Sequence, residues 1–331
     1  MFATRPAYNG FMKLMLAALG LLTGAGASAA EYLLTEDQDL IGVPRVIEAR
    51  YEDTFPSIAR AHNVGFEALR RANPGVDPWL PGEGTTIVVP TQFVLPQAPR
   101  QGIVVNLPEL RLYYFPDGES GRVVTYPVSI GRMDWRTPLG RTTIVNKTRN
   151  PSWYPPESIR AEHAAMNDPL PAVVPPGPDN PLGAHALRLA IPGGYLIHGT
   201  NKPAGVGMRV THGCIRMFPE DVEALFSVVA IGTQVLIVDQ PYKLGFGEDG
   251  LYLEAHQPLP ALSEGEEPAS SAVTELTRAY VAATENRPAQ VQWDAAEIAI
   301  EAARGIPQFV SIVPVTADSD EAIIRAVETA L

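Results

Sequence analysis

The amino-acid sequence predicts a mainly β fold, a sandwich- or barrel-like domain over residues 101–240, flanked by two small α/β regions. From residue 102 to 131, apolar and polar residues alternate between turn signals such as Pro116-Asp117-Gly118, which is typical of antiparallel hairpins. Further β-rich runs follow, and the last of them is "GTQVLIVD" at 232–239. Thirty-two prolines among 331 residues also favour strands, turns and loops over long helices.

Two segments interrupt this β pattern. In "PEDVEALFSVV", apolar residues recur at helical spacing from Val222 to Val229, so one helix is expected there. Residues 147–183 are rich in proline, and a loop that long inside a compact domain is usually functional or disordered. We expect this insert to form a substrate lid, and the alternative is a floppy insertion. The candidate lid residues are Trp153, Tyr154 and Arg160.

Composition and charge exclude some classes of protein. The chain is 46% hydrophobic and 19% charged, which is typical of a folded chain with a sizeable core. The formal net charge is −12, and no block of basic residues occurs anywhere. This balance argues against nucleic acid as a partner.

The first thirty residues read as a secretory signal peptide. Arg5 and Lys13 supply positive charge, and the apolar run "LMLAALGLLTGAGA" is too short to span a bilayer comfortably. Small residues at Ala27 and Ala29 fit a cleavage site. We therefore expect residues 1–30 to direct export and to be removed, with an uncleaved anchor helix as the alternative.

Residues 44–90 predict a small module of strand, two short helices and strand. The stretch "EDTFPSIARAHNVGFEALRRANPGVDPWLPGEGTTIVVP" resembles the LysM family in its D-T, S-I-A, A-N-P-G and V-x-P signposts. That resemblance implies binding of N-acetylglucosamine-containing glycans such as peptidoglycan. A module kept only as a spacer is the alternative. The implied glycan-binding residues are Asp53, Thr54, Asn73 and Pro74.

Residues 241–331 predict a linker and a small α/β subdomain at the C-terminal end. An acidic linker with prolines and serines, "PLPALSEGEEPAS", precedes an amphipathic helix marked by Leu276 and Tyr280. A second helix is expected in "DAAEIAIEAARG", with Asp294 as its N-cap and Gly305 as its stop. A last helix is expected in "SDEAIIRAVETAL". None of these segments carries a catalytic pattern.

Cys214 is the only cysteine in the chain and lies in "RVTHGCIRM". It could be a small buried core residue, the site of a disulfide with a second copy, or a nucleophile. An exported chain rarely keeps one unpaired cysteine without a use. A cysteine nucleophile needs a nearby base or cations, and two histidines and two arginines are close in sequence. A zinc site is disfavoured because the paired Cys and His spacings of such sites are absent from the sequence.

His198 and His212 compete for the role of base. On an extended segment, His212 and Cys214 lie about 6–7 Å apart, which is long for a hydrogen bond. His198 in "LIHGT" ends a predicted strand, and from a neighbouring strand it could reach the sulfur directly. The base would also need a third group to fix its tautomer. Backbone N–H groups of Gly213 and Cys214 could face a developing oxyanion.

The segment "IHGTNKPAGVGMRVTHGCIRM" resembles the active-site signature of the L,D-transpeptidase catalytic domain, the YkuD family. "TPLG", "NPLG" and "GTQVLIVD" match further signposts of that family, and the resemblance covers about residues 101–240. It implies a cysteine acyl transfer with no metal and no organic cofactor. Cys214 would be the nucleophile and His198 the base, with the Gly199 carbonyl orienting the imidazole. The implied oxyanion and pocket residues are Gly213, Thr211, His212 and Arg216.

The resemblance also implies the substrates and the location. The donor would be the diaminopimelate residue of a peptidoglycan tetrapeptide, with loss of terminal D-Ala, in the periplasm. Arg216 stands where many members have Asn, which is a feature of a proteobacterial periplasmic branch that anchors an outer-membrane lipoprotein to peptidoglycan. We therefore expect a lipoprotein lysine as acceptor, with diaminopimelate (a 3→3 cross-link) or water as alternatives. A periplasmic thioredoxin-fold reductase is an expected partner that would keep Cys214 reduced.

Overall fold

The computed structural model describes residues 30–312, except for residues 36, 118–120, 133 and 261–270. Apart from Ala30, the predicted signal peptide lies outside the described residues, and so does the last predicted helix near the C-terminal end. Within the described ranges, none of the helices is long and apolar enough to cross a membrane.

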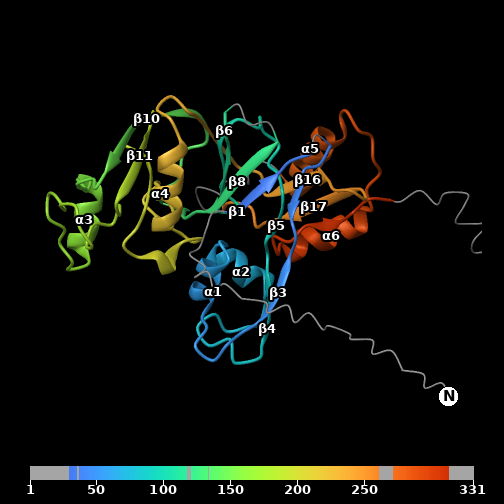
Figure 1. Ribbon diagram of the computed structural model, residues 1–331, viewed down its shortest axis with the longest axis horizontal. Coiled ribbons are helices and arrows are strands. Elements are labelled where there is room, and N and C mark those ends of the chain that lie inside the picture. Colours follow the sequence, from blue (N-terminus) through green and yellow to red (C-terminus); the bar gives the residue numbers. More distant parts are fainter. Residues whose placement is uncertain (1–29, 36, 118–120, 133, 261–270, 313–331) are drawn as a thin grey trace, which may run out of the picture.

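The architecture is mainly β, as the sequence predicts, and its centre is one curled, half-barrel sheet of nine strands (Figure 1). Most neighbours in this sheet are antiparallel, but β15 pairs with β6 and β12 pairs with β14 in parallel. The strands, in spatial order, are β1 (Ala30–Leu33), β8 (Arg122–Pro127), β7 (Arg111–Phe115), β6 (Gly102–Asn106), β15 (Gln234–Val238), β10 (Gly140–Arg149), β11 (His185–Leu189), β12 (Leu196–His198) and β14 (Ile215–Arg216).

Short pairs of strands complete the β structure. Three of these pairs lie around the main sheet, and a three-stranded sheet lies in the C-terminal subdomain. The strands are β2 (Leu40–Gly42) with β5 (Gln92–Val94), β3 (Arg45–Glu48) with β4 (Thr86–Val89), β9 (Ile130–Gly131) with β13 (Arg209–Thr211), and β16 (Tyr242–Phe246) with β17 (Leu251–Ala255) and β18 (Gln308–Phe309).

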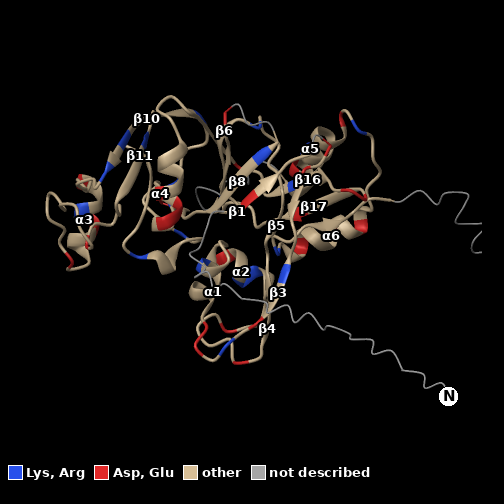
Figure 2. Ribbon diagram, viewed as in Figure 1, with Lys and Arg blue, Asp and Glu red and all other residues tan. Residues whose placement is uncertain are grey.

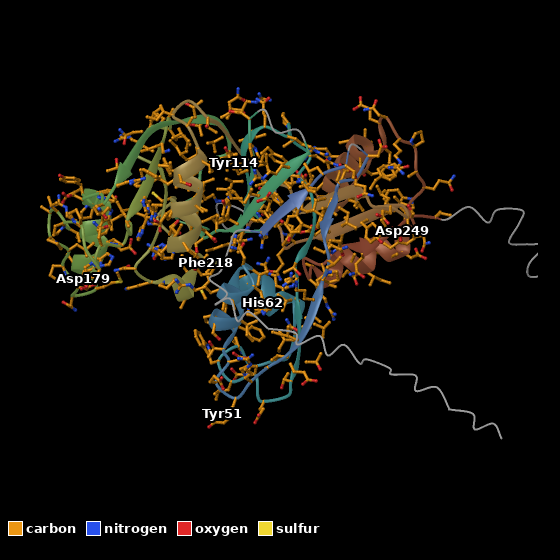
Figure 3. The ribbon with its side chains drawn as sticks, viewed as in Figure 1. Tyr51, His62, Tyr114, Asp179, Phe218 and Asp249 are labelled. Atoms are coloured by element: carbon orange, nitrogen blue, oxygen red, sulfur yellow. The ribbon has the colours of Figure 1, made fainter. Side chains whose placement is uncertain are left out.

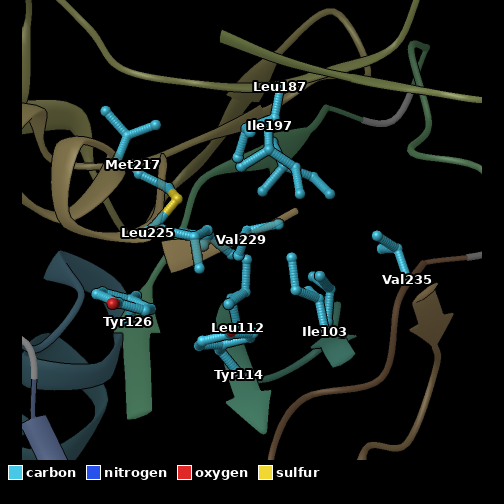
Figure 4. Close-up of a cluster of buried hydrophobic side chains, with 14 of the residues drawn as sticks. Ile103, Leu112, Tyr114, Tyr126, Leu187, Ile197, Met217, Leu225, Val229 and Val235 are labelled. Carbon is cyan, nitrogen blue, oxygen red and sulfur yellow. The ribbon is translucent and has the colours of Figure 1, made fainter. Parts of the chain in front are cut away.

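Helix α4 (Pro219–Val228) covers the concave side of the sheet near β11, and its apolar face fills the main core (Figures 1 and 4). The predicted stripe is confirmed, because Val222, Leu225, Phe226 and Val229 are all buried. Tyr126, Leu187 and Ile197 join them from the strands. Burial of such side chains contributes about 1.5–3 kcal/mol each.

The insert at 147–183 is more regular than the sequence predicts. Strand β10 continues to Arg149, and helix α3 (Glu157–Ala165) follows at the edge of the molecule, near Asp179 (Figures 1 and 3). The described part of residues 101–240 therefore holds two α-helices, α3 and α4, and the prediction of one helix is wrong. The prolines lie beside α3, and Pro156 is its N-cap, so they delimit the helix without interrupting it.

Residues 45–89 fold as strand, helix α1 (Phe55–Ala61), helix α2 (Phe66–Ala72) and strand. Phe55, Ile58 and Leu69 form the centre of a small core of this module. The module packs below the main sheet and touches the start of α4, near His62 and Phe218 (Figures 1 and 3).

Two polar contacts fix the module against the acidic first turn of α4 (Figure 2). Arg60 forms a two-point ion pair with Glu220 at 2.8 Å, and Asn63 Nδ2 donates to the Asp221 carboxyl at 3.0 Å. Burial, then the neighbouring Glu220 charge, raises the pKa of Asp221 to about 7. The interface therefore holds a carboxyl that is largely neutral below pH 7.

The C-terminal subdomain packs α5 (Ala272–Thr284) and α6 (Trp293–Ala302) on the three-stranded sheet (Figure 1). Helix α6 begins at Trp293 with Gln292 as its cap, so the prediction of Asp294 as N-cap is wrong. The Gln292 backbone N–H donates to Val310 O at 2.8 Å, and this tertiary bond sets where the helix begins. The helix ends at Ala303 in the left-handed region, two residues before Gly305.

A buried ion network joins this subdomain to the main sheet. Lys243 Nζ is fully buried and lies 2.8 Å from Glu109 Oε2, 3.1 Å from Glu254 Oε2 and 2.6 Å from Val94 O. Glu254 also contacts His256 at 2.6 Å. One ammonium thus links residues from β5, the turn between β6 and β7, and the C-terminal subdomain.

We predict that Lys243→Met lowers the free energy of unfolding by about 3–5 kcal/mol, because it leaves Glu109 and Glu254 buried without their cation. Denaturant titration followed by tryptophan fluorescence measures this change. The control is Arg278→Met, which removes an exposed partner of Glu275 and should cost less than about 1 kcal/mol. Equal effects of the two substitutions would contradict the assignment of Lys243 as a structural centre.

Candidate active site

Strand β12 carries His198, and Cys214 immediately precedes β14, the neighbouring strand. In their parallel register, Ile197 is opposite Ile215 and His198 is opposite Arg216. Both isoleucines are fully buried in the main core. Because side chains alternate along extended backbone, we infer that His198 and Cys214 project from the other face.

His198 is 4% exposed, and its Nδ1 lies 2.6 Å from the Gly199 carbonyl oxygen. A carbonyl only accepts hydrogen bonds, so the Gly199 contact favours the tautomer with the proton on Nδ1. The Leu182 backbone is a second hydrogen-bond partner of the ring. Burial, followed by the nearby Arg216 charge, lowers the pKa of His198 to about 4. The imidazole is therefore neutral at pH 7 and able to take a proton at Nε2.

Cys214 is partly exposed and is the only cysteine in the sequence. Burial of its sulfur raises the pKa of the thiol, and a hydrogen bond with the Leu196 backbone and the Arg216 charge oppose that rise. The resting site thus pairs a neutral thiol with a neutral imidazole, which is the arrangement that general-base activation of a nucleophile requires.

The loop before Cys214 is held by hydrogen bonds to its carbonyl groups. Thr211 Oγ1 donates to Cys214 O at 2.6 Å, and Thr137 Oγ1 donates to Gly213 O at 2.9 Å. Gly213 has a φ of +97°, and a Cβ there would lie 2.7 Å from the Tyr195 ring. A larger residue at 213 would therefore distort the nucleophile loop, which we define as residues 209–214.

Arg216 combines a fixed backbone with an unpaired side chain. Its N–H donates to Ser129 O at 2.9 Å, and its carbonyl accepts from Ser129 N–H at 2.8 Å. Its buried Nε has no hydrogen-bond partner among the described residues. Burial lowers the pKa of this guanidinium, with Cys214 close enough to influence it. The side chain therefore offers unused donors beside the sulfur.

His212 points toward the insert. Its Nε2 lies 3.0 Å from Glu162 Oε2 on α3, and its ring meets Trp135 edge-on with ring centres 5.2 Å apart. Glu162 also accepts a hydrogen bond from Arg132. Hydrogen bonds from Arg132 and then His212 lower the pKa of Glu162, so this contact persists at neutral pH.

Glu162 is the one residue of the insert that has a hydrogen bond to the nucleophile loop among the described residues, and sequence reasoning missed it. The three predicted lid residues lie elsewhere. Trp153 forms a bridge with Val174, Tyr154 is 68% exposed, and Arg160 pairs with Glu157 in its own helix. An acidic residue in a proline-rich insert gives no spacing signal, so only the fold could identify Glu162.

The four predicted glycan-binding residues lie together in the first module, and three of them have local structural partners. Asp53 accepts from the Arg50 N–H, and Thr54 caps α1 through the Ser57 N–H. Asn73 is 6% exposed and exchanges hydrogen bonds with the Val88 backbone. Pro74 follows it at the exposed end of α2. Glycan contact by this group stays a prediction.

Three residues with metal-ligand chemistry, Glu109, Glu254 and His256, meet among the described residues away from Cys214. The Lys243 ammonium lies between their carboxylates and supplies the positive charge there. The arrangement is an ion-pair network of the protein's own side chains.

We predict that Glu162→Gln loosens α3, since the neutral amide loses its charge-assisted bonds to Arg132 and His212. Hydrogen exchange of the α3 amides, followed by mass spectrometry at pH 7, should become several-fold faster. Glu157→Gln is the matched control, because Glu157 lies in the same helix and pairs only with Arg160 among the described residues. Identical exchange in both variants would show that Glu162 does not hold the insert.

Comparisons with known proteins identify the family of the chain. Residues 100–237 match the family model of the L,D-transpeptidase catalytic domain, YkuD. The chain is 51% identical over 210 residues to the probable L,D-transpeptidase YcfS of Escherichia coli K12, covering 62% of this chain and 65% of that protein. It is 41% identical over 255 residues to the probable L,D-transpeptidase YbiS of the same strain, covering 75% of this chain and 82% of that protein. The probable L,D-transpeptidase ErfK/SrfK of that strain is 37% identical over 283 residues, covering 83% of this chain and 89% of that protein. The chain therefore belongs to the L,D-transpeptidase family.

Proposed function

We propose that this protein is a periplasmic peptidoglycan L,D-transpeptidase that works through a Cys214 thioester. The observation that carries the proposal is the neutral, buried His198, with Nδ1 fixed by the Gly199 carbonyl, on the strand beside Cys214. The family membership supports the same reaction class. Export rests on the predicted signal peptide, and the acyl donor is a tetrapeptide stem of peptidoglycan.

In the first half-reaction, Cys214 Sγ attacks the carbonyl carbon at the L-centre of diaminopimelate while its proton passes to His198 Nε2. Gly213 and Cys214 N–H groups stabilise the oxyanion. The carbon–nitrogen bond to terminal D-Ala then breaks, and His198 returns the proton to the departing amine. The product is a thioester on Cys214 and free D-Ala.

In the second half-reaction, an incoming amine attacks the thioester and gives its proton to His198 Nε2. A new amide forms, and the proton passes to the Cys214 sulfur, which restores the thiol. We favour a lysine amine of a lipoprotein as the acceptor. Arg216 binds a carboxylate of the donor stem, because its unpaired guanidinium lies beside the sulfur.

The N-terminal module contributes glycan binding in this proposal, as a LysM-type domain. Its position supports that role, since the Phe66 and Glu67 N–H groups donate to Val206 O and Gly207 O at 3.2 Å each. A Cβ on Gly207 would lie 2.3 Å from Gly65, so the two backbones touch. A glycan held on this module would be held next to the segment that leads to Cys214.

We predict that purified enzyme and a disaccharide-tetrapeptide yield free D-Ala and a protein adduct of the matching mass. Cys214→Ser should lose the reaction, and His198→Gln should slow it by about 10²–10⁴-fold, as expected for removal of a general base. Mass spectrometry of protein and muropeptides measures both. Release of tripeptide alone, with every amine acceptor ignored, would make the protein a hydrolase.

We predict a simple pH profile for acylation of Cys214 by a carbapenem. The rate should rise as His198 loses its proton near pH 4 and then stay level through neutral pH, because the pKa of the thiol lies above its usual value. Arg216→Gln should move the inflection upward, since the Arg216 charge lowers the pKa of His198. Stopped-flow mixing measures the profile, and an inflection near pH 6.5 in the wild type would contradict the buried-base assignment.

A further inference from the structure

A pocket lies between the catalytic domain and the chain segment 257–260. Its cavity volume is about 70 Å³, and part of it is open to solvent. Leu107, Leu139 and Leu259 give it apolar walls, while Arg136, Arg209 and Asp239 give it charge. The cavity is smaller than a typical small-ligand site, so it suits one small charged group rather than a whole ligand.

The two arginines converge on the same wall. Arg209 Nη2 lies 3.4 Å from Gln257 O, and Arg136 donates to Pro260 O. Each guanidinium has five N–H donors. The bonds to Gln257 O and Pro260 O are the only side-chain hydrogen bonds that Arg209 and Arg136 form with described residues. The Arg209 Nε is buried without a partner. Both groups therefore keep donors for an anion.

The pocket is positively charged although the chain is acidic. Asp239 lines the pocket and is close enough to both arginines to interact with their charges. In the described part of the chain, it forms no ion pair within 4 Å with either arginine. Glu67 also influences Arg209, but it is paired with Arg70 at 2.7 Å. Glu275 lies near enough to Asp239 to raise the pKa of its carboxyl, but it does not line the pocket. Among the described lining residues, two guanidinium groups therefore face one acid, which suits a carboxylate.

The pocket wall is continuous with the nucleophile loop. Thr137, which lines the pocket, donates to Gly213 O at 2.9 Å and accepts from Gly131 N–H at 3.1 Å. Arg209 begins β13, five residues before Cys214. A molecule in the pocket would thus lie against the segment that carries the sulfur, and the Arg136 carbonyl borders Gly213 directly.

We propose that this pocket binds the free carboxylate of the amine-bearing acceptor substrate, with Arg209 and Arg136 as its ligands. The proposal rests on the transferase function proposed above. The chemistry that it names is a primary amine separated from a free carboxylate by a short aliphatic chain, as in a chain-terminal lysine. A diaminopimelate D-centre, in which one carbon carries both groups, would present its amine at a different distance from the pocket.

The test compares two acceptors that differ only in the carboxylate. Nα-acetyl-lysine and Nα-acetyl-lysinamide are each offered to the full-length exported protein with a disaccharide-tetrapeptide donor, and the transfer product is quantified by mass spectrometry. The wild type should use the acid with a KM about tenfold or more below that of the amide. Arg209→Gln should raise the KM for the acid toward that for the amide, so that the ratio of the two KM values approaches one.

Arg136→Gln is the second variant, and it should give the same pattern if Arg209→Gln does not fold by circular dichroism. Arg141→Gln is the matched control, because Arg141 is an exposed arginine of the same domain outside this pocket. Free meso-diaminopimelate is added as a third acceptor to distinguish the two sources of the carboxylate. The acceptor that the pocket prefers will take the larger share of transfer when diaminopimelate and Nα-acetyl-lysine are offered together.

The donor half-reaction separates the two proposals. D-Ala release without acceptor requires Cys214 and His198 and does not require the acceptor pocket, so its absence overturns the transferase function itself. Normal D-Ala release with equal use of acid and amide, or with a KM that Arg209 and Arg136 do not change, overturns the pocket assignment alone. Normal D-Ala release without transfer to either acceptor also overturns the pocket assignment.

Discussion

The parallel pairing of β12 with β14 is the constraint on which the rest of the site depends. It buries Ile197 and Ile215 in the main core, and the alternation of side chains then forces His198 and Cys214 onto the opposite face. Sliding one strand by a residue would exchange the two faces and bury the sulfur among apolar side chains. The energy of the core therefore fixes the geometry of the reacting groups.

The same core sets the protonation of the site. Because His198 lies at 4% exposure against the sheet, burial keeps its imidazole neutral, and the Arg216 charge acts in the same direction. The Gly199 carbonyl fixes the tautomer without adding a charge, whereas a carboxylate in that place would raise the pKa of the ring. A buried base oriented by a neutral backbone group can thus accept a proton over a wide range of pH.

The sequence was informative where function needs a local pattern. The spacing around Cys214, the alternation of the strands and the apolar stripe of α4 all lie within short windows, and the structure has that stripe buried. Glu162, Lys243 and Arg209 carried no such signal, because their partners are distant in sequence and only folding brings them together. Asp294 failed as a cap for the same reason, since a bond to Val310 starts the helix earlier.

Three parts of the molecule converge on the short nucleophile loop and its approach. The N-terminal module holds residues 206 and 207 through backbone bonds, the insert holds His212 through Glu162, and Thr137 holds Gly213. Each contact uses a different element, so each can loosen without the others. A loop restrained from three sides holds the thiol in place for acylation, while the contacts of α3 to Arg132 and His212 all pass through Glu162, so the insert is the part best able to move to admit a large substrate.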